Sequence, residues 1–151
     1  MNKLRLYLDN CCFNRPYDDQ TQLKIKLETE AKLAIQTAIK RGDFELGWSY
    51  ILDFENDNNP QIERKLEIEK WKNIATFDIE ENTNILIKMN VLVSLGLKPL
   101  DALHLSCAIN SSCDYFLTVD RGVIKKRHLI TEIKIMTPID FVMQMEDGSD
   151  D

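Results

Sequence analysis

The sequence predicts a single α/β domain whose parallel β-sheet carries helices on both faces. Short apolar runs alternate with longer amphipathic segments, which is the pattern of a parallel sheet with helical crossovers. The chain has 151 residues, enough for one domain with a sizeable core. No internal repeat and no Gly/Ser-rich linker divides it. We therefore expect one domain over residues 1–145 and an acidic disordered tail over residues 146–151.

Four apolar runs predict the strands. Each is short and bounded by a turn or an acid, as strands buried on both faces are. The runs cover residues 4–8, 44–48, 115–119 and 133–136. The first and third are followed directly by Asp9 and Asp120.

Helices are predicted between the strands by apolar spacing and by their end signals. They cover residues 18–40, 50–55, 62–71 and 79–95, a segment from Pro99, a short turn or helix from Arg121, and residues 138–145. Ser49 is a good N-cap, Pro99 suits a first helical position, and Gly42 and Gly96 end two helices. Residues 11–16 are expected as a loop.

Two helices have a predicted inward face. In the first helix this face is made by Leu27, Ala31, Ala34 and Ala38. In the helix over residues 62–71 it is made by Ile62, Leu66, and Ile68 or Trp71. Trp48 and Trp71 are both expected in the core or an interface.

Composition and charge exclude few partners. Hydrophobic residues make up 44% of the chain and charged residues 29%, an ordinary balance for a globular protein. No uncharged apolar run approaches the ~20 residues of a membrane helix, and Asp9 interrupts the N-terminal segment before a signal-peptide core could form. We therefore expect a cytoplasmic protein with no membrane partner. The net charge is −6, but the last six residues carry four carboxylates, so it does not exclude a nucleic-acid partner.

The four cysteines predict reduced, mostly buried thiols. They form no C-x-x-C pair, and His104 and His128 are not spaced as zinc-finger ligands. Reduced thiols agree with a cytoplasmic location. The cysteines are Cys11, Cys12, Cys107 and Cys113.

Four acids are expected to converge on one edge of the sheet. Right-handed crossovers place the carboxyl ends of parallel strands on the same edge, where Asp9 and Asp120 both lie. Glu55 and Asp101 lie on helices whose starts could reach that edge. Ligands of such sheets bind in the crevice where the strand order reverses.

The shared chemistry of these acids points to a divalent cation. Carboxylates that crowd together raise one another's pKa unless a cation neutralises them, and Mg²⁺ or Mn²⁺ prefers oxygen ligands. Such an ion can supply a hydroxide in line with a phosphodiester and stabilise the leaving oxygen. The pattern therefore predicts metal-dependent phosphodiester hydrolysis.

Each acid also has a purely structural interpretation. Asp9 and Asp120 could cap the helical turns after their strands, and Asp101 could offset the positive end of a helix. Glu55 could be a solvated helix residue. These readings leave unexplained why two buried strands both end in Asp.

Four segments of the chain resemble PIN-domain ribonucleases, the fold of VapC-type toxins. They read LYLDN, SYILDFE, PLDALHLSCAI and YFLTVD, and the similarity runs from Leu4 to about Ile139. The block over residues 98–120 is its most specific part. The resemblance assigns the four acids of the family to Asp9, Glu55, Asp101 and Asp120, as catalytic and metal-binding residues.

The resemblance also implies supporting residues, a cofactor and partners. Asn10, Ser49, Thr118 and Arg121 would support the metal site or the substrate. The cofactor would be Mg²⁺ or Mn²⁺, the substrate RNA, and the partner an antitoxin protein. The chain departs from the family at two positions. Asn10 stands where family members often have Thr or Ser after the first acid, and Arg121 stands where an acid or a small residue often follows the fourth acid.

The sequence signals for an RNA-binding surface and for partner surfaces are less specific than those for the acids. Lys98, Arg121 and residues 125–128 could hold RNA phosphates or form a solvated charged turn. His104, three residues after Asp101, could bond a substrate or a site carboxylate, or pack in the helix interface. The helix over residues 62–71 could contact a partner or a second copy of the chain in a homodimer.

The sequence leaves three alternatives to a ribonuclease. A catalytically inactive PIN-like module that binds nucleic acid or protein would share the fold but lack carboxylate-dependent Mn²⁺ affinity. Haloacid dehalogenase-type phosphotransfer needs a second Asp two residues after the first, where this chain has Cys11. A receiver domain needs an acidic pair after its first strand, and this chain lacks that pair.

Overall fold

A five-stranded, all-parallel sheet forms the centre of the protein. The computed structural model describes residues 3–149. The strands are β1 (Arg5–Leu8), β2 (Glu45–Ser49), β3 (Phe77–Ile79), β4 (Tyr115–Leu117) and β5 (Lys134–Met136), in the spatial order β3-β2-β1-β4-β5. The predicted α/β class with a parallel sheet is confirmed.

The strand order reverses beside β1. The chain leaves β1 for β2 and β3 on one side, then crosses back to β4 and β5 on the other. Tyr7 of β1 is in register with Gly47 of β2 and with Phe116 of β4. The carboxyl ends of β1 and β4 therefore flank the point at which a parallel sheet opens a crevice for ligands.

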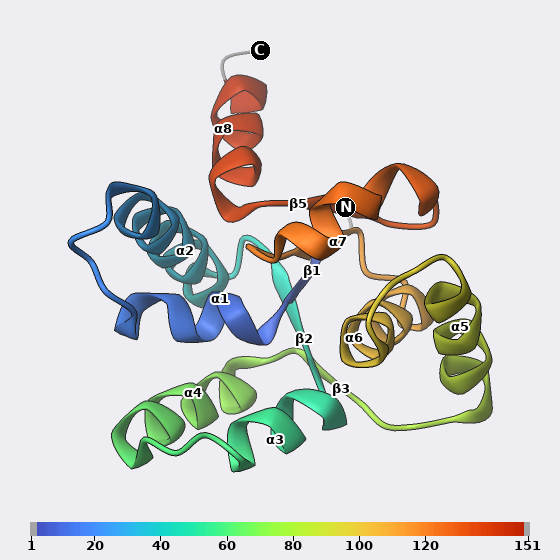
Figure 1. Cartoon of the computed structure of the whole chain (residues 1–151). Coiled ribbons are helices and arrows are strands. Elements are labelled where there is room, and N and C mark those ends of the chain that lie inside the picture. The colour runs from blue at the N-terminus through green and yellow to red at the C-terminus, as the bar shows by residue number, and fades with distance from the viewer. Residues whose placement is uncertain (1–2, 150–151) are drawn as a thin grey trace.

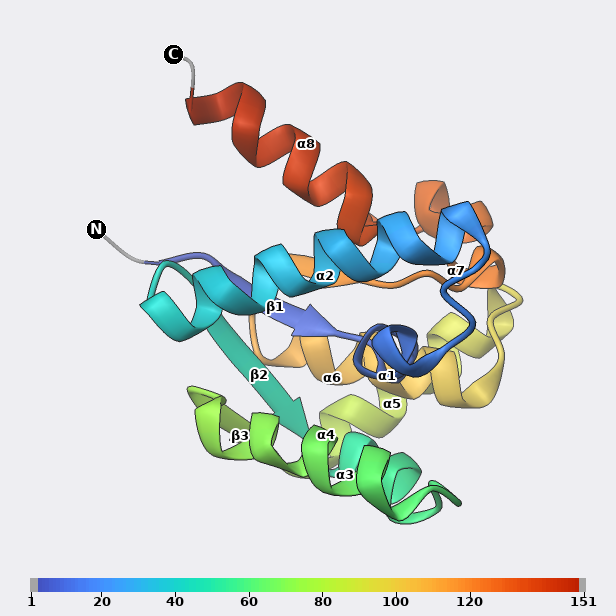
Figure 2. The same ribbon diagram turned by 90° about the vertical axis from the view of Figure 1, so that its left-hand side faces the viewer.

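Helices cover both faces of the sheet. They are α1 (Asn10–Asn14), α2 (Leu23–Arg41), α3 (Tyr50–Asp57), α4 (Ile62–Ile74), α5 (Thr83–Ser94), α6 (Pro99–Asn110), α7 (Arg121–Lys126) and α8 (Pro138–Ser149), with short 3₁₀ turns η1 (Arg15–Tyr17) and η2 (Arg127–Leu129). Figure 1 shows α1, α2 and α4 on one side of the strands and α5 and α6 on the other. Figure 2 shows β1 and β2 pointing toward the side where α1 and α7 lie.

Two elements were wrong in the sequence prediction. The expected loop over residues 11–16 is mostly the helix α1, which begins because the Asp9 carboxylate accepts a hydrogen bond from the Asn10 N–H. The helix expected from Ile79 begins at Thr83 instead, and Ile79 ends the strand β3. Asn82 caps that helix by accepting a hydrogen bond from the Ile85 N–H. Both errors arise because three- to five-residue elements carry too little periodicity to detect.

The predicted inward faces of two helices are partly wrong. In α4, Ile68 and Trp71 are buried, but Ile62 and Leu66 are 71% and 53% exposed. In α2, Leu27 and Ala34 are exposed, because this face borders α8 across shallow hollows. The face of α2 that packs into the core instead includes Ile35, Ile39 and the charged Lys32.

The C-terminal helix extends into the expected tail. α8 continues through Ser149, beyond the boundary at residue 145 that the sequence suggested. The rest of that expectation falls on Asp150 and Asp151, which lie outside the described residues. Within residues 3–149, no helix is long and apolar enough to cross a membrane. All four cysteines are free, and Cys11 alone is partly exposed.

Lys32 is a cation enclosed by aromatic rings. It is 3% exposed, and its Nζ lies 5.4 Å from the ring centre of Phe13 and 5.6 Å from that of Trp71. Burial lowers the pKa of Lys32 from 10.5 to about 7, with Cys12 opposing the shift and Lys40 adding to it. The ring faces offset part of the cost of the buried charge.

Lys32→Met is expected to flatten the pH dependence of stability above neutral pH. The folded pKa lies below that of the unfolded chain, so between about pH 7 and 10.5 the unfolded chain binds more protons. Lys32 therefore adds a contribution to the unfolding free energy that rises with pH in this window, by at most about 1.4 kcal/mol per pH unit, and Lys32→Met removes this contribution. Urea unfolding across the window measures this slope. The exposed Lys26→Met is the control on the same helix and should keep the slope, whereas an unchanged slope in Lys32→Met would contradict the assignment.

Candidate active site

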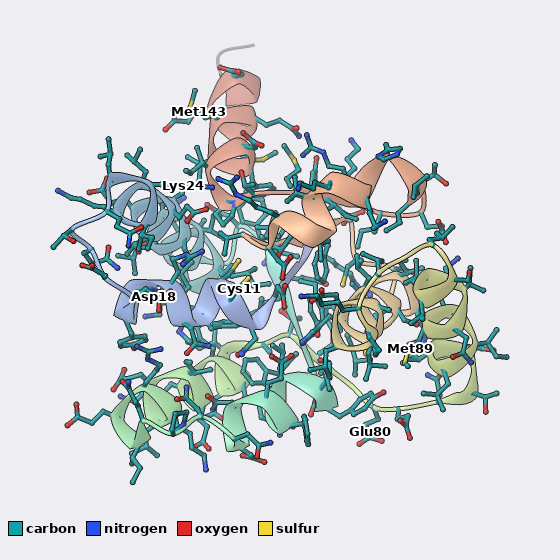
Figure 3. All side chains as sticks on the ribbon, viewed as in Figure 1. Cys11, Asp18, Lys24, Glu80, Met89 and Met143 are labelled. Carbon is teal, nitrogen blue, oxygen red and sulfur yellow. The ribbon has the colours of Figure 1, made fainter. Side chains whose placement is uncertain are left out.

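The four predicted acids line one cleft at the carboxyl edge of the sheet. Asp9 follows β1, Asp120 follows the strand segment after β4, Glu55 lies in α3 and Asp101 lies in the first turn of α6. The cleft has a volume of about 540 Å³ and is also lined by Asn10, Cys11, Lys98, Pro99 and Leu100. Figure 3 labels Cys11, one of these lining residues, on α1 near the middle of the view.

Asp9 is both a helix cap and a wall of the cleft. It is 5% exposed. Its Oδ1 accepts a hydrogen bond of 2.8 Å from the Asn10 N–H, and its Oδ2 accepts one of 2.8 Å from the Thr118 hydroxyl. The structural and functional interpretations of Asp9 are therefore compatible, because an ionised carboxylate has about four acceptor positions.

Thr118 links the ends of the two central strands. While it donates to Asp9, its Oγ1 accepts a hydrogen bond of 3.0 Å from the Asp120 N–H. Asp120 in turn caps α7, with its Oδ1 accepting from the N–H groups of Gly122 and Val123. This arrangement sets the first and fourth acids on opposite sides of the same hydroxyl group.

Glu55 reaches the cleft because Ser49 starts α3 at the end of β2. The Ser49 hydroxyl accepts a hydrogen bond from the Leu52 N–H, as predicted for an N-cap. Glu55 then lies on the second turn of α3. Its Oε2 accepts a hydrogen bond of 3.1 Å from the Asn10 side-chain amide, and its Oε1 contacts His104 Nε2.

A buried polar chain behind the cleft holds Glu55. The Tyr7 hydroxyl lies 2.6 Å from Ser49 Oγ and 2.6 Å from His104 Nδ1, and the opposite ring nitrogen of His104 contacts Glu55. Both His104 and Tyr7 are buried. His104 thus bonds a site carboxylate, one of the roles considered from the sequence. Tyr7 was missed, and its only sequence signal is a polar atom in the strand that leads to Asp9.

The electrostatics of the chain favour a proton on His104. Burial lowers the pKa of His104, but the hydrogen bond with Glu55 and the charge of Asp9, 3.8 Å away, more than reverse this and raise the pKa above 6.5. Burial keeps the pKa of Tyr7 well above 10. When it carries a proton, His104 offsets part of the negative charge of the cleft.

Asp101 is the acid whose carboxylate is left open to a ligand. Within residues 3–149 its carboxylate has no hydrogen-bond partner. Burial, followed by the charges of Asp120 and Asp9, raises the pKa of Asp101 from 3.8 to about 6. The cleft therefore holds negative charge in excess of what His104 and Lys98 neutralise.

The donor set of the cleft fits a hard divalent cation in its chemistry. Carboxylate oxygens are the ligands that Mg²⁺ and Mn²⁺ prefer, and burial, together with the charges of Asp120 and Asp9, raises the pKa of Asp101. In the described part of the chain, however, no three His, Cys, Asp or Glu side chains form a group that could hold a metal ion. Glu55 is directed to His104 and Asp120 to the α7 amides, so ligation would require these side chains to turn toward Asp101.

The predicted basic residues divide between two places. Lys98 lines the carboxylate cleft. Arg121 and Lys125 instead line a neighbouring hollow of about 300 Å³, together with Lys24 of α2. Arg121 therefore does not join the four acids in their cleft.

Comparison of the sequence with protein-family models and with curated proteins found no match. The family resemblance of the four segments accordingly stays a prediction. The functional interpretation depends on the cleft and on the residues that line it.

Proposed function

We propose that the protein is a metal-dependent endoribonuclease that hydrolyses RNA phosphodiester bonds at the carboxylate cleft. The observation that supports this proposal most is the position of Asp9, Glu55, Asp101 and Asp120 around one cleft at the point where the strand order reverses. Asp9 and Asp120 both make capping hydrogen bonds, whereas the Asp101 carboxylate, in the first turn of α6, has no hydrogen-bond partner among residues 3–149 and lies close to the charges of Asp120 and Asp9.

Mg²⁺ or Mn²⁺, held by Asp101, Asp9 and Asp120 with Glu55 completing the set, would activate a water and stabilise charge on the leaving oxygen. The chain's own groups have distinct parts in the proposal. Thr118 fixes Asp9 against the end of β4. The hydrogen-bonded chain from Ser49 through Tyr7 to His104 orients Glu55. Lys98 at the rim supplies a positive charge for the substrate phosphate. In the overall step water adds to phosphorus, the P–O bond to the leaving ribose breaks, and that oxygen takes up a proton.

The second candidate is a PIN-like module that binds nucleic acid or protein without turnover. The contact between Glu55 and His104 favours it, because this pair neutralises one acid internally. So does the lack of a preassembled metal group within residues 3–149. In this case the polar network would stabilise the fold, and the cleft would have no carboxylate-dependent affinity for Mn²⁺.

The wild-type protein is expected to cleave single-stranded RNA when Mg²⁺ or Mn²⁺ is added and to be inactive in EDTA. Gel analysis of a labelled RNA with each ion and with EDTA measures the dependence. Calorimetric titration with Mn²⁺ alone separates the two candidates. Cleavage that persists in EDTA, or Mn²⁺ binding without any cleavage, would contradict the ribonuclease proposal.

The antitoxin implied by the family resemblance and the homodimer both stay predictions. A toxin role requires an antitoxin that blocks the cleft or its approaches. A homodimer requires an apolar surface, and α4 offers the exposed Ile62 and Leu66.

A further inference from the structure

A second hollow lies beside the carboxylate cleft on the same edge of the sheet. It has a volume of about 300 Å³ and is lined by Lys24, Glu28, Val119, Arg121, Ile124, Lys125 and Thr137. We call it the basic hollow. Val119 and Arg121 line the basic hollow, while Asp120, between them in the chain, lines the cleft. One turn of backbone therefore forms the wall that the two cavities share.

The basic hollow brings together three exposed cations from two separate elements. Lys24 comes from α2, and Arg121 and Lys125 come from α7. None of the three forms an ion pair with an acid among residues 3–149. The one acid in the lining, Glu28, is 3% exposed and has its own partner, with Arg15 Nε 3.3 Å from its Oε1. The positive charge of the basic hollow is thus left for a ligand.

The start of α2 adds a second source of positive potential. Gln22 makes no side-chain capping bond, and the first turn of this 19-residue helix contains no acid. It contains Lys24 and Lys26 instead, which the helix dipole disfavours at this end. An anion in the basic hollow would offset the unfavourable position of Lys24 at this end of the helix dipole. Figure 2 shows this end of α2 on the same side of the molecule as α1 and α7, and Figure 3 labels Lys24 between α2 and α8.

We propose that the basic hollow binds a backbone phosphate of the RNA strand whose neighbouring phosphodiester lies in the carboxylate cleft. The identity of the ligand as RNA rests on the proposed function. Phosphate oxygens are the anions that arginine and lysine side chains hold in nucleic-acid complexes. The shared wall at Asp120 places the anion-binding and acidic cavities side by side, so one strand can occupy both. Because the net charge of the chain is −6, a local positive surface would favour the approach of RNA.

The test is a binding measurement that does not depend on cleavage. A short fluorescein-labelled oligouridylate is titrated in EDTA by fluorescence anisotropy at several salt concentrations. The variant combines Lys24→Gln, Arg121→Gln and Lys125→Gln. We expect it to bind at least about tenfold more weakly, and its log–log salt slope to fall by about 0.7, because one phosphate neutralised on a single strand contributes about that much.

A second triple variant controls for net charge. It combines Lys3→Gln, Lys70→Gln and Lys134→Gln, which are exposed and lie outside both cavities. It removes the same charge and should keep the wild-type slope. Equal slopes in the two triple variants would overturn the proposal. So would displacement of the oligouridylate by inorganic phosphate at an equal concentration of phosphate groups, since the basic hollow would then hold free phosphate rather than a strand.

The cleavage assay separates this inference from the proposed function. Wild-type protein that binds RNA through the basic hollow but cleaves none with Mg²⁺ or Mn²⁺ would overturn the nuclease and leave the binding site. Metal-dependent cleavage with equal salt slopes in both triple variants would overturn only the basic hollow.

Discussion

Asp101→Asn is expected to reduce RNA cleavage by about 10²–10³-fold, the usual loss when one group that stabilises a transition state electrostatically is removed. Asparagine keeps the shape of the side chain but removes the charge. Asp101 has the largest expected effect because its carboxylate has no hydrogen-bond partner within residues 3–149, so its change leaves the capping of α1 and α7 intact. The loss should appear in kcat and in the affinity for Mn²⁺. Full cleavage by this variant would remove Asp101 from the site.

The chain contains a matched control for this change. Asp140 is the third residue of α8, which begins at Pro138, just as Asp101 is the third residue of α6, which begins at Pro99. Asp140→Asn therefore loses the same favourable contact with a helix dipole, about 0.3–1 kcal/mol, without touching the cleft. It should cleave RNA as the wild type does.

Stability measurements guard against loss of activity by unfolding. Burial and the charges of Asp120 and Asp9 raise the pKa of Asp101 to about 6. A raised folded pKa means that the contribution of Asp101 to stability falls as pH rises from about 4 through about 6. Asp101→Asn has no such loss and is expected to unfold at the same or a higher urea concentration at neutral pH. An unfolded variant would not support the active-site assignment.

Trp48→Ala is expected to destabilise the protein by about 3–5 kcal/mol, the usual cost of removing a buried large aromatic side chain. Trp48 is 1% exposed in β2, and its ring contacts that of Phe13 edge-on with centroids 5.4 Å apart. Its Nε1–H donates a hydrogen bond of 2.9 Å to Asp53 of α3. Equilibrium unfolding in urea measures the loss.

Trp48→Phe separates the two contributions of this residue. Phenylalanine retains most of the buried ring but cannot donate to Asp53, whose carboxylate still has Lys72 Nζ 3.0 Å away. We expect a smaller loss, with the hydrogen bond contributing about 1 kcal/mol. A loss in Trp48→Phe equal to that in Trp48→Ala would show that the hydrogen bond, not the packing, dominates. Because Trp48 directly precedes Ser49, the Ala variant should also reduce cleavage by moving α3 and Glu55.

Local signals were sufficient for much of the fold. The apolar runs before Asp9 and Asp120 predicted β1 and β4, because strands that are buried on both faces consist of nearly continuous apolar residues. Ser49, Pro99 and Gly42 predicted helix ends because their capping geometry depends on a few neighbouring residues.

The errors lie where long-range packing decides the outcome. β3 has three residues, and its pairing with β2 through Gly47 and Phe77 is what makes it a strand. The inward face of α2 includes Lys32 rather than Ala34, because aromatic rings from α1 and α4 lie beside the Lys32 Nζ. Apolar spacing alone cannot reveal such an arrangement.

The same division holds for the candidate site. The sequence alone determined which acids end strands or begin helices, because chain connectivity and crossover handedness place those positions on one edge of the sheet. Only the tertiary structure decided which side chains contact them. Thr118 joins Asp9 to Asp120 across two strands, His104 joins Tyr7 to Glu55 across three elements, and Arg121 lies with Lys24 in the basic hollow. The contacts of Thr118 with Asp9 and of His104 with Tyr7 and Glu55 connect residues 109, 97 and 49 positions apart in the chain, and no local pattern encodes a contact that forms only when the sheet assembles.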